Sequence, residues 1–126
     1  TKNIEDWTAH TCWRYLQEPE NRVAVLQNTW VRPEDIHHYA DYCDVIKLAT
    51  RMHARPRLVV DAYCRRRFRG NLLDLCEPGY SQIFAPQIID NTRFPEDWFD
   101  RTSTCDKRCH ACEYCARVLQ QVLVEI

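Results

Sequence analysis

Residues 44–50 read DVIKLAT, and residues 55–69 read RPRLVVDAYCRRRFR. The first stretch is short, contains β-branched residues and is bounded by polar ones, which predicts a β-strand. In the second stretch apolar residues recur at roughly helical spacing, and Gly70 supplies a left-handed stop, so the pattern predicts a helix over 55–69. A strand, a short turn and a helix in this order indicate an α/β fold.

Outside this unit the sequence predicts mostly helical structure. Proline and acidic residues begin the segments 18–28 and 33–42, and Asn28 ends the first, so both segments predict helices. Residues 113–126 carry an amphipathic apolar pattern, which predicts a terminal helix. We further expect a helical turn at 71–76, a turn at 77–79 and irregular chain at 80–100.

Size and composition narrow the possible functions. A chain of 126 residues is the usual size of one domain, and the net charge of -1 gives no overall attraction to nucleic acid or membrane. The two glycines do not form a dinucleotide fingerprint, and the chain has no HExxH motif. No apolar run approaches the roughly 20 residues that span a bilayer, so we expect no membrane contact. The scattered remaining cysteines do not resemble a secreted disulfide framework, which favours the reducing cytoplasm.

Four of the eight cysteines lie close together near the end of the chain, as Cys105, Cys109, Cys112 and Cys115. This CxxxCxxCxxC spacing lets successive thiolates curl around one compact centre, as in the closely spaced cysteine runs of ferredoxins. The helix predicted to follow offers unpaired N–H groups and the positive end of its dipole, which favour thiolates and an anionic cluster. The spacing therefore predicts a [4Fe-4S] cluster on these four cysteines.

Zinc is the main alternative to iron at this site. Structural zinc usually takes two pairs of ligands separated by a loop of about a dozen residues or more, and no such loop separates these cysteines. In some iron–sulfur runs the fourth cysteine binds elsewhere, so one ligand of this centre could be remote. Cys12 is the first candidate for that ligand and His110 is the second.

Residues 45–52 (VIKLATRM), followed by a helix that contains YCRR at 63–66, resemble the late strand and helix of the collagenase-like peptidase family. Typical members read IK(I/L)xGRM at this place, and Thr50 replaces their glycine here. Residues 30–37 (WVRPEDIH) and 70–75 (GNLLDL) are similar to uncharacterised barrel proteins related to that family, which also end in a cysteine cluster.

This resemblance implies a (β/α)-barrel, and several members of the family hold a [4Fe-4S] cluster and support oxygen-independent hydroxylation of quinones or RNA. A whole barrel takes about 250 residues. We therefore expect the C-terminal portion of such a barrel, completed by another polypeptide, by residues on the N-terminal side or by a homo-oligomer. Residues 1–79 would form the barrel-like strand and helix portion, and residues 80–126 the irregular segment, the cysteine cluster and the terminal helix.

Barrels build their active sites at the C-terminal ends of their strands, so the resemblance makes Arg51 the first candidate catalytic residue and Lys47 the second. An arginine there could clamp a carboxylate or phosphate with two parallel hydrogen bonds. It could equally cap the strand in a surface ion pair, and a strand lysine is often solvent-facing.

Two functions follow from these observations. The first is an iron–sulfur protein that forms a domain or subunit of an oxidoreductase or oxygen-independent modifying enzyme. The alternative is a non-catalytic binding module with a structural four-cysteine zinc site that docks a partner protein or RNA. The arginines of 55–69 could meet RNA phosphates, although nearby acidic residues and the near-neutral net charge favour a solvated helix face.

Overall fold

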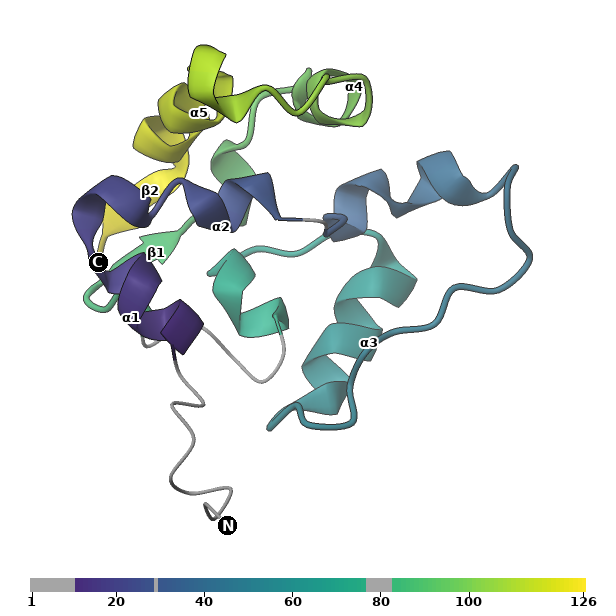
Figure 1. Cartoon of the computed structure of the whole chain (residues 1–126). Coiled ribbons are helices and arrows are strands. Elements are labelled where there is room, and N and C mark those ends of the chain that lie inside the picture. Colours follow the sequence, from purple (N-terminus) through teal and green to yellow (C-terminus); the bar gives the residue numbers. More distant parts are fainter. Residues whose placement is uncertain (1–10, 29, 77–82) are drawn as a thin grey trace, which may run out of the picture.

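The computed structural model describes residues 11–28, 30–76 and 83–126, which form short helices around one small sheet (Figure 1). The α-helices are α1 (Thr11–Gln17), α2 (Ala24–Gln27), α3 (Pro56–Arg65), α4 (Trp98–Ser103) and α5 (Tyr114–Val122). The 3-10 helices are η2 (Pro19–Asn21), η3 (Pro33–Tyr39), η4 (Leu72–Leu75), η6 (Asn91–Arg93) and η7 (Cys109–Ala111). The strands are β1 (Gln87–Ile89) and β2 (Leu123–Glu125).

The sheet joins the end of the chain to its middle. β1 and β2 are antiparallel, with Ile89 opposite Leu123 and Gln87 opposite Glu125. β2 continues directly from α5, and the Asp90 N–H donates to the carbonyl oxygen of Val122 at 2.8 Å. The C-terminal end of α5 is therefore held against β1. This contact also fixes the position of the N-terminal end of α5.

The hydrophobic core draws on the five α-helices, on η4 and on β1. Its most deeply buried apolar side chains belong to η4, β1, α5 and the residues just before β1, and they are Leu73, Phe84, Ile89 and Val122. The α-helices contribute one face each, as the alternation of buried and exposed residues in α3 and α5 shows.

A buried polar network lies beside this core. Asn91 is 0% exposed, and its Oδ1 accepts a hydrogen bond from Arg32 Nε at 2.8 Å. Its Nδ2 donates to both Glu34 carboxylate oxygens at 3.0 Å and to the Phe68 carbonyl at 2.7 Å. The Phe68 N–H in turn donates to Glu34 Oε2 at 2.9 Å. One asparagine thus joins the start of η3, the chain after α3 and the start of η6.

The strand predicted at 44–50 is wrong for the described chain. Asp44 lies in a bend and residues 45–50 have no regular secondary structure, and in the described chain no strand pairs with them. A β-strand forms only when a neighbouring strand pairs with its backbone N–H and carbonyl groups. The residue types within one segment do not determine whether such a neighbour is present. The described residues form one sheet of two strands, and the expected barrel portion stays a prediction.

The helix predicted over 55–69 forms as α3, but it ends earlier. Arg66 adopts a left-handed conformation with φ of 58°, and its N–H bonds to the Tyr63 carbonyl. Gly70, the predicted stop, lies beyond this point at φ of 149°, where a Cβ atom would come within 3.2 Å of the Phe68 ring. The helix therefore ends at Arg66. The chain turns there, which brings the Phe68 carbonyl to the side-chain amide of Asn91.

The other predictions from periodicity hold in part. The segment 18–28 splits into η2 and α2, and the segment 33–42 forms the 3-10 helix η3. The helical turn at 71–76 is confirmed as η4, and the predicted turn at 77–79 lies outside the described residues. Residues 83–100 are more regular than expected, since they contain β1, η6 and the start of α4. The terminal helix, predicted to run to residue 126, ends at Val122.

No helix of the described chain is long and apolar enough to cross a bilayer.

Replacing Asn91 with alanine is expected to lower the free energy of unfolding by about 3 kcal/mol, because the change leaves the Arg32 and Glu34 charges without their buried amide partner. Gln121→Ala is the matched control, since that exposed amide donates one hydrogen bond, to the Arg93 carbonyl, and the change should cost less than about 1 kcal/mol. Urea denaturation followed by circular dichroism measures the free energy of unfolding of both variants. Equal losses would contradict the role given to the buried network.

Arg66→Gly is expected to raise the free energy of unfolding by about 0.5–1 kcal/mol, because glycine adopts a positive φ without the clash of a Cβ atom. The neighbouring change Arg65→Gly should have the opposite sign and a similar size, since Arg65 is helical and pairs with Asp61 at 2.9 Å. The same denaturation experiment compares the two, and a destabilised Arg66→Gly variant would contradict the left-handed helix end.

Candidate functional site

The cysteine segment, defined here as residues 104–115, joins α4 to α5 at one end of the molecule (Figure 1). A tight turn bends it after Cys105: the Arg108 N–H donates to Asp106 Oδ1 at 3.1 Å, and Lys107 adopts a left-handed φ of 62°. The short helix η7 follows the turn directly. The bend brings Cys105 and Cys109 to the same side of the segment, where both line one cavity.

This cavity has a volume of about 190 Å³ and lies between the cysteine segment and the rest of the body. Cys105, Cys109 and Cys115 line it from one side, together with Lys107. The other side consists of residues from the α2 to η3 region and from α4, including the rings of Trp30, Tyr39, Trp98 and Phe99. Three of the four predicted ligands therefore face one space with an aromatic wall.

A stack of aromatic rings fixes the beginning of α5 against that wall. Trp30 stacks on Trp98 with ring centroids 5.8 Å apart, and Trp98 stacks on Tyr114 at 6.1 Å. The Tyr114 hydroxyl donates to Asp97 Oδ1 at 2.8 Å, and the Arg101 guanidinium lies 4.2 Å from the centre of the Tyr114 ring. Because Tyr114 is held from three directions, the adjacent Cys115 is the best-positioned thiol of the four.

An ion pair lines the inner part of the cavity. Arg32 is 8% exposed, and its Nη1 lies 3.8 Å from Asp35 Oδ2. Burial lowers the pKa of Arg32, although Glu34 and Asp35 oppose the shift. Burial also raises the pKa of Asp35, against the effect of Arg32. Since an arginine stays protonated at neutral pH and Asp35 also lines the cavity, the two side chains place a charge pair opposite the cysteines.

The N-terminus of α5 points unpaired N–H groups toward the cysteine segment. Its first backbone bond within the helix runs from the Arg117 N–H to the Glu113 carbonyl, and Glu113 provides no side-chain cap. The N–H groups of residues 114–116 therefore have no partner in the described part of the chain. Such groups and the helix dipole favour negative charge on nearby sulfur.

The four thiols lie within electrostatic range of one another. Burial raises the pKa of Cys115, and negative charge on Cys109, Cys112 and Cys105 raises it further, while Lys107 lowers it. Repulsion among thiolates is what a bound cation relieves, because the metal supplies positive charge among them. Soft thiolate donors are the type that thiolate-ligated metal groups use.

These donors do not form a closed cage. Across residues 11–28, 30–76 and 83–126, no three Cys, His, Asp or Glu side chains lie close enough together to hold an ion. Cys105, Cys109 and Cys112 are exposed, so their side chains have room to turn. Ligation requires the exposed thiols to rotate toward Cys115, which the aromatic stack holds in place.

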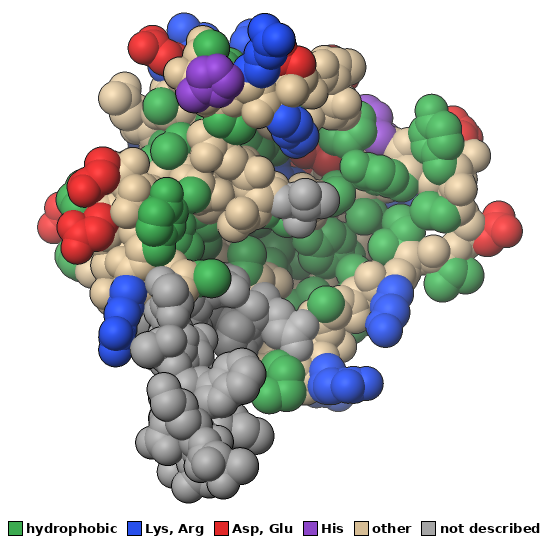
Figure 2. Space-filling model, in the orientation of Figure 1, with side chains coloured by type: hydrophobic (Ala, Val, Ile, Leu, Met, Phe, Trp, Pro, Cys, Tyr) green, Lys and Arg blue, Asp and Glu red, His purple; other side chains and the backbone are tan. Residues whose placement is uncertain are grey.

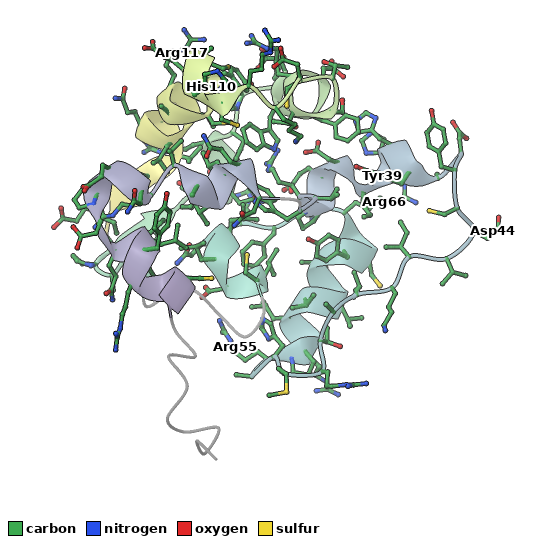
Figure 3. The ribbon with its side chains drawn as sticks, in the orientation of Figure 1. Tyr39, Asp44, Arg55, Arg66, His110 and Arg117 are labelled. Carbon is green, nitrogen blue, oxygen red and sulfur yellow. The ribbon has the colours of Figure 1, made fainter. Side chains whose placement is uncertain are left out.

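The structure places the remaining predicted site residues apart from this cavity. Cys12 is exposed on α1 and lines a different cavity of about 380 Å³, together with Cys76. His110 is exposed in η7 and lies at the outer edge of the molecule in Figure 3. Lys47 and Arg51 are exposed on the chain between η3 and α3, and neither lines the cavity beside the cysteines.

Sequence reasoning missed Arg32 and Asp35 as residues of the site. One signal was present, because a residue before proline favours the extended conformation that Arg32 adopts ahead of Pro33. That signal predicts the backbone conformation of Arg32. It does not predict which residues its side chain contacts. Besides the nearby Glu34 and Asp35, Arg32 contacts Asn91 and the ring of Phe94 at 4.6 Å, which come from a distant part of the chain.

Comparison with known proteins gives one informative match. An uncharacterized protease of Methanocaldococcus jannaschii is 28% identical over 102 residues, which cover 79% of this chain and 30% of that protein. The chain thus spans about 30% of the length of the curated relative it matches. No family model and no solved structure matches the chain.

Cys76 is expected to react slowly with iodoacetamide at pH 8, because burial raises the pKa of its thiol to about 11 from an ordinary 9.0. A shift of that size reduces the reactive thiolate about 100-fold, and the rate should keep rising until the pH approaches 11. Exposed Cys64 serves as the internal comparison, and in urea the two rates should converge. Peptide mass spectrometry measures the alkylation rate at both cysteines. Equal rates in the folded protein would contradict the burial of Cys76.

Proposed function

We propose that the chain holds a [4Fe-4S] cluster on Cys105, Cys109, Cys112 and Cys115 and acts as a domain or subunit of an oxidoreductase or oxygen-independent modifying enzyme. The observation that carries the proposal is the cavity that Cys105, Cys109 and Cys115 share with an aromatic wall. Spacing alone groups the four residues in the sequence, whereas the cavity gives three of their side chains a common space.

The surroundings of the cysteines support an anionic cluster. Lys107 lines the cavity, and the first N–H groups of α5 have no partner in the described part of the chain. Each of these groups stabilises negative charge on sulfur. Such a cluster, when bound, supplies one-electron transfer, and its potential depends on hydrogen bonds to sulfur and on solvent exposure.

The protein family proposed for the chain is the collagenase-like peptidase family with its related iron–sulfur barrel proteins. The match to an archaeal protein named as a protease supports this assignment, and so does the VIKLATRM stretch at 45–52. In this proposal the chain contributes the C-terminal portion of a (β/α)-barrel. Arg51 and Lys47 lie on the exposed chain before α3 and are the candidates for contact with an anionic substrate.

Anaerobic purification tests the cluster directly. We expect a brown protein with absorption near roughly 400 nm and with iron and sulfide in equal amounts. Replacing Cys105, Cys109, Cys112 or Cys115 with serine is expected to lower bound iron to below about one tenth in each case, since a serine hydroxyl is a poor substitute for a soft thiolate ligand. Iron analysis of each purified variant measures the loss.

Cys43→Ser and Cys64→Ser are the matched controls, because both residues are exposed cysteines outside the segment and should leave the iron content unchanged. Cys12→Ser reports on a remote ligand, and loss of iron there would replace one of the four assigned cysteines. A colourless protein with zinc in place of iron would contradict the proposal and favour a structural zinc site in a binding module.

A further inference from the structure

Three arginines near the C-terminal end of α3 line one hollow in the surface. The hollow has a volume of about 390 Å³, which lies in the range of small-molecule sites. Arg65, Arg67 and Arg69 line it and are exposed. Leu58 and Phe68 also line it, and both are half-buried and pack against the hydrophobic core. The hollow therefore has an apolar floor and a positively charged rim.

Backbone hydrogen bonds hold the chain that carries two of these arginines. The Arg67 N–H donates to the Ala62 carbonyl at 3.2 Å, as in the Schellman motif that ends many helices. The neighbouring Phe68 is bonded through its N–H and its carbonyl to the buried polar network around Asn91. Because Arg67 and Arg69 flank Phe68, their backbone positions are set before any ligand binds. Such preorganisation lowers the cost of binding.

The fold explains one of the three guanidinium groups and leaves the other two unexplained. Arg65 Nε lies 2.9 Å from Asp61 Oδ1, one helical turn away, and forms an ion pair within α3. The side chains of Arg67 and Arg69 make no hydrogen bond or ion pair in the part of the chain that the structure describes. Both residues also lie beyond the last turn of α3, where the helix dipole favours positive charge.

The charge of the hollow favours a ligand with two negative charges. Its three guanidinium groups and the Asp61 carboxylate leave two positive charges. A phosphate monoester carries about two negative charges near neutral pH, and its oxygens accept pairs of hydrogen bonds from a guanidinium group. A carboxylate or a sulfate ester carries one negative charge and matches the hollow less well.

A nucleic-acid backbone is a poorer ligand for this hollow than a small molecule. Proteins that bind such a backbone present a groove or stripe of positive charge along its path. In the face that Figure 2 shows, the Lys and Arg side chains of the described residues lie in separate groups near the edges and form no continuous stripe. The net charge of the chain is -1. A compact anion therefore suits this hollow better than a long one.

We propose that the hollow at the end of α3 binds a small phosphate monoester with an apolar body. The guanidinium groups of Arg67 and Arg69 hold the phosphate, and the apolar body covers Leu58 and Phe68. The inference rests neither on the cysteine segment nor on any metal, so it stands or falls independently of the proposed cluster.

Amide NMR of the full chain, titrated with phenyl phosphate, tests the proposal. We expect shifts of the amide signals of residues 66–70. Phenyl phosphate should bind at least about threefold more tightly than inorganic phosphate, because the ring covers apolar surface that the bare ion leaves exposed. Phenyl sulfate has the same shape and one negative charge fewer, so it should bind about fivefold more weakly than phenyl phosphate.

Single substitutions identify the residues that bind the phosphate. Arg67→Gln and Arg69→Gln should each weaken the binding of phenyl phosphate about two- to fivefold, as expected for the loss of one exposed ion pair. Both side chains are exposed, so the changes leave the core intact. Arg57→Gln is the matched control, because Arg57 is exposed on the same helix and does not line the hollow, and its affinity should be unchanged.

Three results would overturn the proposal. They are the absence of shifts at residues 66–70, equal binding of phenyl phosphate and phenyl sulfate, and an equal loss of affinity in the Arg57→Gln variant. A short oligouridylate that bound more tightly than phenyl phosphate would overturn the choice of a small ligand and favour a nucleic-acid backbone.

Discussion

The side-chain amide of Asn91 is the contact on which the arrangement of this protein depends. It is fully buried and is shared by a guanidinium, a carboxylate and a backbone carbonyl from separate parts of the chain. A buried amide must find partners for both its oxygen and its nitrogen, because an unpaired polar group inside a protein costs several times more than a typical hydrogen bond gains. The fold therefore tolerates little change in how η3, η6 and the end of α3 meet.

This constraint also shapes the candidate metal site. Arg32 is held by Asn91 on one side and by the ring of Phe94 on another, so its charge has a fixed place at the inner end of the cavity. Trp30 precedes it by two residues, donates its ring N–H to the Val25 carbonyl at 2.8 Å and stacks on Trp98. The wall that faces the cysteines is therefore an outcome of the same network that holds the core.

Sequence reasoning found the local features and missed the long-range ones. The helical parts of 55–69, 71–76 and 113–126 were predictable, because a helix satisfies its own backbone and its pattern lies in neighbouring residues. The grouping of the four cysteines was visible from their spacing. The two-stranded sheet, the left-handed Arg66 and the pairing of Arg32 with Asn91 were not, since each depends on residues far apart in the sequence. The strand expected at 44–50 failed for the same reason.

The exposed chain between η3 and α3 has a consequence for the lifetime of the protein. Proteases bind their substrates in extended form, and exposed segments without backbone pairing are the first places they cut. Lys47 and Arg51 lie in this exposed region, and both are side chains after which trypsin-like enzymes cleave. A cut after either residue would leave the two parts of the chain joined by the buried network, because Arg32 and Glu34 lie before the cut and Asn91 lies after it.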